Sequence, residues 1–347
     1  MTSNDWLTQL EQLSGCSWPS ITKAAAESAK THDMIVQALQ PQRFGNSEVG
    51  LVVFGSLARG ERTSGSDVDW TLLIDGQAAP EHRELAHEVS TLLKDLKLKE
   101  PNPDGAFGDL TFSHELVHMI GGDADSNRNL TQRMLLLLES QCLVGEDVRS
   151  RVVRNVLQRY LEDDQWDLTQ SGHKGRIPRF LLNDIVRYWR TMAVDYASKR
   201  WQRANRGWAL RNVKLRMSRK LLFASGLLLC FAPCAFAKHE QFASAPNLES
   251  EILSLVDLRP LELVAMGLVI TGQAGPARKI MGSYDAFLAC LDSTEKRTEL
   301  EKLPFEKAES NAAFQEMRSV SHDFQDGLDE LIACLEPQKL VRTYAIF

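Results

Sequence analysis

Two aspartates that are one residue apart, Asp67 and Asp69, have the clearest chemical potential in this sequence. They begin an apolar run, DVDWTLLI (67–74), that is typical of a buried strand. Because side chains alternate along a strand, both carboxylates should project from one face of the sheet. Two adjacent carboxylates are costly unless a cation neutralises them, and Mg²⁺ is the usual oxygen-ligated partner of nucleoside triphosphates. The pair therefore predicts a Mg²⁺ site, with Mn²⁺ as an alternative ion.

A glycine-serine turn, Gly55-Ser56, lies shortly before the aspartates and follows another apolar run, EVGLVVF (48–54). A glycine lets a ligand approach the backbone closely, and a helix that begins just beyond it would direct free N–H groups and its positive dipole end outward. Arg59 and Arg62 add positive charge nearby. These features predict a triphosphate site, for which the candidate residues in this segment are Gly55, Ser56, Arg59 and Ser66.

The segment GSLARGERTSGSDVDW (55–70) resembles the DNA polymerase β-like nucleotidyltransferase superfamily, in which a Gly-Ser turn precedes Asp-apolar-Asp on the next strand. It is most similar to the minimal nucleotidyltransferases and to the catalytic domain of the PII-protein uridylyltransferases. The latter share the helix and Leu-x-Gly-Glu/Asp turn of LTQRMLLLLESQCLVGED (130–147). The chain has no evident ligand-sensing tail, so the resemblance does not extend to PII uridylylation.

The resemblance covers about 100 of the 347 residues and implies two metal ions, an NTP substrate and the release of pyrophosphate. It also implies a third carboxylate on a later strand. Asp109 in GDLTFS (108–113) is the best match, and Asp104 in the preceding turn is the alternative. Asp67 and Asp69 would bind both metals, while Asp109 would bind the catalytic metal and help to deprotonate the acceptor.

Hydrophobic periodicity predicts a helical lead-in, then a palm, then a chain that is wholly helical. Together with the resemblance, this order predicts the fold class: an α+β nucleotidyltransferase palm, with a small mixed sheet flanked by helices, followed by an all-α domain. The predicted domains are 1–44, 45–148, 149–237 and 238–347. The predicted strands are 48–54, 67–74 and 108–113, and the predicted helices are 80–96, 130–142, 149–163, 176–204, 207–232, 248–271, 274–291 and 305–336.

Residues 171–220 carry fourteen Lys or Arg and only two acids, although the net charge of the chain is −6. This segment has three interpretations. The resemblance implies capture of the triphosphate by Lys214, Arg219 and Lys220. The interleaved Trp189, Trp201 and Trp208 are instead compatible with RNA binding. The third interpretation is a solvated helix face with the tryptophans in the core.

His114 and His118 form an HELVH pattern that fits a zinc protease. We expect no zinc, because the segment follows a short strand, reaches Gly121-Gly122 after a turn and a half, and has no third ligand nearby. The six cysteines include no CxxC unit and are expected to be reduced structural thiols. The apolar run 221–237 is near the lower limit of a membrane span, and we expect a buried core helix and no stable membrane insertion.

These patterns predict a nucleotidyltransferase that moves a nucleoside monophosphate from an NTP, by default ATP, to an acceptor. A protein side chain is the first choice of acceptor, and a nucleic-acid end such as that of tRNA, or a small molecule, is the second. A catalytically silent regulatory or antitoxin-type protein is the non-enzymatic alternative. The start of the sequence has no secretory pattern, which favours the cytoplasm. The oligomeric state is not predicted.

Overall fold

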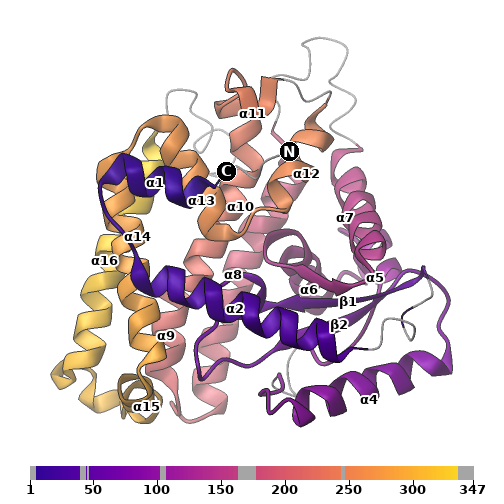
Figure 1. The fold of residues 1–347 in the computed structure, drawn as a ribbon, viewed down its shortest axis with the longest axis horizontal. Coiled ribbons are helices and arrows are strands. Elements are labelled where there is room, and N and C mark those ends of the chain that lie inside the picture. The colour runs from indigo at the N-terminus through magenta and orange to yellow at the C-terminus, as the bar shows by residue number, and fades with distance from the viewer. Residues whose placement is uncertain are drawn as a thin grey trace. The chain divides into compact units, whose positions relative to one another are not determined.

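The computed structural model describes residues 5–39, 44, 47–101, 107–162, 177–243 and 247–334. The chain forms two compact units (Figure 1). The palm unit consists of Lys23–Asp163, and the helical unit consists of Met1–Thr22 together with Asp164–Phe347. The division into four domains stays a prediction.

A four-stranded mixed sheet forms the centre of the palm unit. Its strands are β1 (Val49–Phe54), β2 (Asp69–Ile74), β3 (Asp109–Phe112) and β4 (Gln141–Val144). They lie in the order β3-β2-β1-β4, with β1 antiparallel to β2 and β4, and β2 parallel to β3. The first three correspond to the predicted strands 48–54, 67–74 and 108–113.

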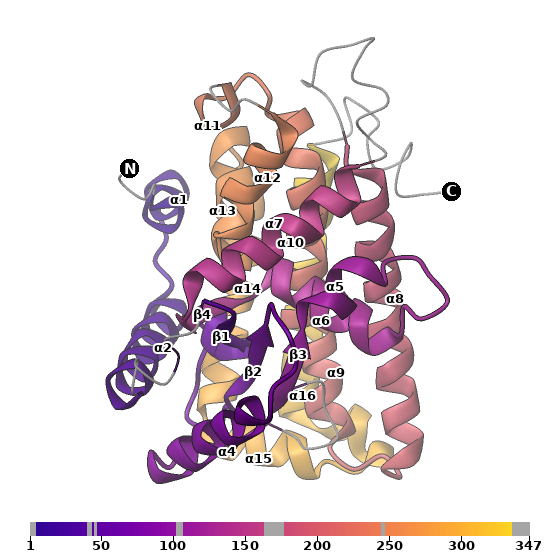
Figure 2. The same ribbon diagram turned by 90° about the vertical axis from the view of Figure 1, so that its right-hand side faces the viewer.

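One face of the sheet packs against α2 (Pro19–Ala38) and α4 (Pro80–Asp95), as Figure 2 shows. Alternate strand residues such as Leu51 and Leu72 are completely buried there against Ile35 of α2 and Val89 of α4. Helix α4 begins with a proline in its first turn, where the missing N–H costs nothing. Burial of this apolar layer, at about 25 cal/mol per Å², stabilises the sheet that carries the site.

The opposite face contacts α5 (Ser113–His118), α6 (Asn127–Leu138) and α7 (Glu146–Leu161). Ser126 caps α6 by accepting a hydrogen bond from the Asn129 N–H at 3.1 Å. Helix α7 begins after Gly145, whose φ of 83° is accessible to glycine without strain. A Cβ on Gly145 would lie 2.6 Å from the Val49 carbonyl oxygen, so the close approach of this turn to β1 also requires glycine.

The predicted helix 130–142 is wrong at its end, because α6 stops at Leu138 and residues 141–144 form β4. The apolar run LLLLESQCLV hides this change, since a strand of four residues is too short to show its own alternation. Strand β4 pairs with β1, opposite the edge that pairs with β2. The fourth strand therefore satisfies a second row of β1 hydrogen-bonding groups that the sequence prediction left unpaired.

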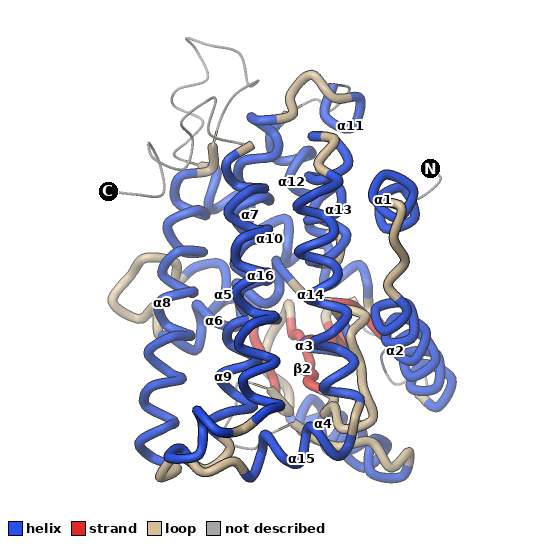
Figure 3. The backbone as a smooth tube through the Cα atoms, turned by 90° about the vertical axis from the view of Figure 1, so that its left-hand side faces the viewer, coloured by secondary structure: helices blue, strands red, loops and turns tan. Residues whose placement is uncertain are grey.

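The described part of the helical unit contains helices and loops (Figure 3). Two predicted helices are each divided in two. The range 207–232 becomes α9 and α10 with a break at Met217, and the range 248–271 becomes α12 and α13 with a break before Pro260. The α-helices of this unit after the palm are α8 (Arg179–Gln202), α9 (Trp208–Arg216), α10 (Ser218–Ala235), α11 (Glu240–Ala243), α12 (Leu248–Val256), α13 (Pro260–Thr271), α14 (Ala274–Asp292), α15 (Thr294–Lys302) and α16 (Ala312–Ala333).

The predicted helix 305–336 begins as a 3₁₀ turn, η3 (Phe305–Ser310), and continues as α16. Helix α15 was not predicted. Near the N-terminus, α1 (Trp6–Ser14) packs on α13 and α14, as part of the predicted lead-in.

Helix α10 lies in the core of the helical unit against α8 and α13. Gly226 allows the α8–α10 contact, because a Cβ at this position would lie 2.9 Å from Ile185 Cγ2. Within the described residues, Trp208–Ala235 is the one stretch long and apolar enough to cross a membrane, and 78% of its most apolar window is buried. That burial is what a core helix requires. All six cysteines are free thiols.

Candidate active site

Gly55 and Asp69 meet where β1 ends and β2 begins. The last residue pair of the β1–β2 ladder is Phe54 with Asp69, so the residue after Phe54 faces the Asp69 side chain. A Cβ on Gly55 would lie 2.6 Å from Asp69 Oδ2, and Gly55 also has a φ of 65°. Both the space and the backbone conformation therefore require glycine. The glycine makes room for a carboxylate, a role that the sequence did not indicate.

The aspartate pair alternates with buried residues, as predicted for a strand. Val68 and Trp70 are buried in the apolar layer, whereas Asp67 and Asp69 are only half-buried. Asp67 precedes β2 and is held by a parallel bridge to Lys99, in which the Val68 N–H donates to the Lys99 carbonyl oxygen at 2.8 Å. No described residue forms a hydrogen bond or ion pair with the Asp67 carboxylate. Hard oxygen donors in this arrangement fit a divalent cation.

A buried network of three charged side chains holds the Gly55 turn. Helix α3 (Gly55–Ala58) is a single turn, and the Gly55 N–H donates to Glu139 Oε1 at 3.1 Å. Arg59 pairs with Glu139 through Nη1 and with Glu61 through Nε at 2.8 Å. The side chains of Arg59, Glu61 and Glu139 are 12%, 2% and 4% exposed. The Gly55 N–H is thus committed to a carboxylate of the protein.

This network changes the interpretation of the Gly-Ser segment. Arg59 is predicted to contact the triphosphate. In the structure its guanidinium pairs with Glu61 and Glu139, and contact with a phosphate stays a prediction. Ser56 is half-buried, and its hydroxyl makes no hydrogen bond to a described residue, so it can donate to a ligand. The Ser66 hydroxyl accepts from the Thr63 N–H at 3.1 Å and closes a turn before the aspartates. The nucleotide-binding role predicted for Ser66 is untested.

Asp109 begins β3 and pairs in register with Thr71 of β2, two residues beyond Asp69. Its Oδ1 forms an ion pair with Arg83 Nη1 at 2.6 Å, and the two side chains are 42% and 70% exposed. The Thr71 hydroxyl donates to the Asp109 carbonyl oxygen at 2.6 Å and so fixes the strand position. Asp104 lies outside the described residues. In the described ranges, no three acidic, histidine or cysteine side chains lie close enough together to hold a metal ion.

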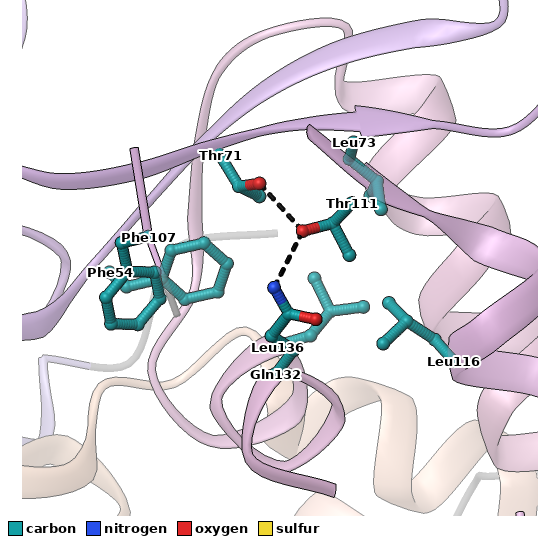
Figure 4. Close-up of a pocket in the computed structure, with 8 residues that line it drawn as sticks. All are labelled: Phe54, Thr71, Leu73, Phe107, Thr111, Leu116, Gln132 and Leu136. Carbon is teal, nitrogen blue, oxygen red and sulfur yellow. Dashed lines mark hydrogen bonds between the residues drawn. The ribbon is translucent and has the colours of Figure 1, made fainter. Parts of the chain in front are cut away.

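A small cavity lies on the face of the sheet that carries Asp69. Figure 4 shows its polar centre, where Gln132 Nε2 donates to Thr111 Oγ1 at 3.0 Å and the Thr111 and Thr71 hydroxyls lie 2.8 Å apart. Phe54 and Phe107 stack at one side, with ring centroids 4.9 Å apart. The cavity measures about 10 Å³, which is room for about one water molecule. It is too small for a nucleotide, and its hydrogen bonds instead join β2, β3 and α6.

The two histidines of HELVH are exposed on α5, with ring centroids 5.1 Å apart. Their helix has only six residues, as the short segment predicted. The absence of zinc stays a prediction.

The predicted triphosphate residues of the helical unit lie in α9 and in the first turn of α10. Burial and nearby Arg216 lower the pKa of Lys220, which Asp329 partly opposes. Arg219 is close enough to Arg211 to lower the pKa of that guanidinium. The roles predicted for Lys214, Arg219 and Lys220 are untested.

A mixed sheet in which a Gly-Ser turn meets an Asp-Val-Asp strand is the arrangement expected of a nucleotidyltransferase palm. The sequence model of the nucleotidyltransferase domain matches residues 35–102, which include β1, the turn, β2 and α4. This part of the chain therefore matches the nucleotidyltransferase domain, which is consistent with the polymerase β-like superfamily that the sequence predicted. Comparisons with curated proteins and with solved structures found no match. Asp109 and Glu139 lie beyond the matched residues.

Proposed function

We propose that this protein transfers a nucleoside monophosphate from an NTP, by default ATP, to an acceptor and releases pyrophosphate. The observation that supports the proposal is that the Asp69 side chain lies against the Gly55 turn, with Asp67 two residues before Asp69, all within the matched domain. This arrangement puts hard oxygen ligands next to a turn that a triphosphate can approach.

The residues of the palm would divide the work. Asp67 and Asp69 would hold two Mg²⁺ ions, or Mn²⁺, and Ser56 would donate a hydrogen bond to the triphosphate. The ions, when bound, supply the Lewis acidity that favours attack on the α-phosphorus and departure of pyrophosphate. Asp109 would complete the ligand set and help to deprotonate the acceptor. Its ion pair with Arg83 is solvent-exposed, and such pairs contribute about 0–1 kcal/mol, so a cation can displace Arg83 at little cost.

The acceptor that we propose first is a protein side chain, because the segment around the aspartates resembles the uridylyltransferase catalytic domains. A nucleic-acid end or a small molecule is the second candidate, and a catalytically silent regulatory or antitoxin-type protein is the non-enzymatic alternative. Lys214, Arg219 and Lys220 are proposed to contact the triphosphate. Replacing all three with alanine should then weaken NTP binding without any need for RNA. The proposed location is the cytoplasm.

The test is the Asp69→Asn variant, which removes a charge from the metal site and keeps the side-chain volume. Purified protein is incubated with each labelled NTP, Mg²⁺ and cell lysate, and the labelled fraction is identified as protein, nucleic acid or small molecule. We expect transfer to fall by more than about a hundredfold, the upper end of what loss of an outer-shell group costs at metal sites.

Asp75→Asn is the matched control, because Asp75 follows the opposite end of β2 and pairs with Arg151. It should retain transfer. Near-normal labelling by Asp69→Asn, or the absence of Mg²⁺-dependent NTP binding in the parent protein, would refute the proposal.

A further inference from the structure

The turn between α8 and α9 gathers positive charge in the helical unit. From Lys199 to Lys220 the sequence contains no acidic residue. We call this surface the basic tip; its members are Arg200, Trp201, Arg203, Arg206 and Arg211. Three of these, Trp201, Arg203 and Arg206, are exposed, and the other two are half-buried.

The arginines of the basic tip lie close together, and no carboxylate within the described ranges neutralises them. Arg211 Nη2 donates to the Arg206 carbonyl oxygen at 2.7 Å. The pKa of Arg211 is lowered by burial and by the charges of Arg203 and Arg219, while Tyr196 and Asp195 oppose the shift. Among the described residues no carboxylate forms an ion pair with an arginine of the tip. The nearest acid in sequence, Asp195, pairs with Lys199 at 2.8 Å.

Two buried polar atoms add to this picture. The Nε atoms of Arg200 and Arg211 are both buried and have no hydrogen-bond partner in the part of the chain that the structure describes. The Arg200 guanidinium lies over the Phe305 ring, 5.4 Å from its centroid, so its position is fixed by an aromatic contact and not by an acid. Placing unneutralised cations side by side costs free energy, which an anionic ligand would recover.

Trp201 differs from the other two tryptophans of this segment. Trp189 stacks on Phe223, with ring centroids 5.3 Å apart. Trp208 is buried, and its indole N–H donates to the Leu303 carbonyl oxygen at 2.8 Å. Both therefore pack within the helical unit. Trp201 is 74% exposed, more than any other large apolar side chain in the described ranges, and it lies between Arg200 and Arg203 in the sequence.

We propose that the basic tip binds single-stranded nucleic acid, with its arginines on the phosphates and Trp201 stacked on a base. Arginines that lack acidic partners match the repeating charge of a phosphate backbone, and an exposed indole ring gives an unpaired base a stacking surface. Inorganic triphosphate would use the charge but not the ring, whereas an NTP carries one base that can stack, so ATP is one of the ligands compared in the test. This proposal does not depend on nucleotidyl transfer, because binding requires neither NTP nor Mg²⁺.

Fluorescence anisotropy of a labelled RNA strand of about 12 nucleotides, within the range of known single-strand sites, tests the proposal on the full chain. Trp201→Ala should weaken RNA binding by about 5- to 150-fold, the range for loss of one base–aromatic stack. The double variant Arg203→Ala/Arg206→Ala should reduce the slope of log affinity against log salt by about 1.4, or about 0.7 for each phosphate contact.

The matched control is Lys296→Ala/Arg318→Ala, which removes two positive charges from exposed ion pairs elsewhere in the helical unit. It should bind RNA as the parent does, and thermal unfolding should show that all variants are folded. The proposal is overturned if RNA does not bind at about 50 mM salt, or if the control loses as much affinity as the tip variants. It is also overturned if ATP, an acidic peptide or anionic vesicles bind with the same dependence on Trp201.

Discussion

Glu139→Gln tests the buried network that holds the Gly55 turn. The substitution removes a negative charge and keeps the shape of the side chain. In the parent, the Glu139 carboxylate is 4% exposed, pairs with Arg59 and accepts the Gly55 N–H at 3.1 Å. The amide oxygen of glutamine can still accept that N–H, so the variant separates the ion pair from the hydrogen bond.

The expected loss of stability follows from these contacts. Removing one partner of a buried ion pair costs about 3–5 kcal/mol, because the remaining charge is left uncompensated. Arg59 keeps Glu61 at 2.8 Å, which lowers the expected cost for Glu139→Gln to about 2–3 kcal/mol. Glu139→Ala also leaves the Gly55 N–H without its acceptor, which adds about 1–3 kcal/mol. Glu139→Gln should therefore fold, whereas the total of about 3–6 kcal/mol for Glu139→Ala reaches the lower end of the stability of a typical domain, about 5–15 kcal/mol, so its urea transition must first establish that it is folded.

Urea unfolding and steady-state transfer measured on the same samples distinguish positioning from simple stabilisation. Glu139→Ala should lower kcat at saturating NTP, because the Gly55 turn flanks Asp69. Glu139→Gln should retain most of the kcat of the parent protein, although the variant is also destabilised. The control is Glu162→Gln, whose 61% exposed side chain pairs with the 51% exposed Arg159 and should cost less than about 1 kcal/mol. Full kcat in Glu139→Ala, or unchanged stability in Glu139→Gln, would refute the reasoning.

Three further predictions concern single side chains. Gly55→Ala should abolish transfer and lower the free energy of unfolding, measured in urea, by about 1–3 kcal/mol. The reason is that its Cβ would lie 2.6 Å from Asp69 Oδ2 on a left-handed backbone. Parent-like transfer and stability would contradict this geometry of the turn. Burial raises the pKa of Cys142 to about 12. The folded state therefore keeps a thiol proton that the unfolded state loses above about pH 9. Above that pH the free energy of unfolding should fall by about 1.4 kcal/mol per pH unit, which is steeper than in Cys142→Ala. Equal slopes would exclude this cause. His114→Ala and His118→Ala should each leave the metal content unchanged, and elemental analysis that finds about one zinc per parent chain would contradict this.

The sequence identified the parts of the palm whose signals are local. The strand predicted at 48–54 is β1, and the strand predicted at 67–74 begins two residues later, as β2. The expected alternation around Asp67 and Asp69 is present, with Val68 and Trp70 on the core side. These predictions succeeded because the apolar run and the alternation of its side chains can be recognised within a single segment of the sequence.

The features that the sequence missed depend on distant contacts. Glu139 reaches Arg59 across 80 residues of sequence, and no motif marks it. Strand β4 forms by pairing with β1, which is distant from it in the sequence. The break at Met217 has neither glycine nor proline to indicate it. The break before Pro260 did have a signal, because the residue before a proline disfavours the helical conformation.

The spacing of the Gly-Ser and Asp-Val-Asp elements has a structural explanation. The antiparallel register of β1 with β2 places Asp69 opposite Phe54. A Cβ on Gly55, the residue after Phe54, would therefore lie 2.6 Å from the Asp69 carboxylate. Any loop that preserves this register requires glycine there, whatever ligand the turn binds. The same glycine gives its N–H to Glu139, which is itself neutralised by Arg59. A negatively charged side chain thus occupies the Gly55 donor, and the donors left for a triphosphate begin at Ser56.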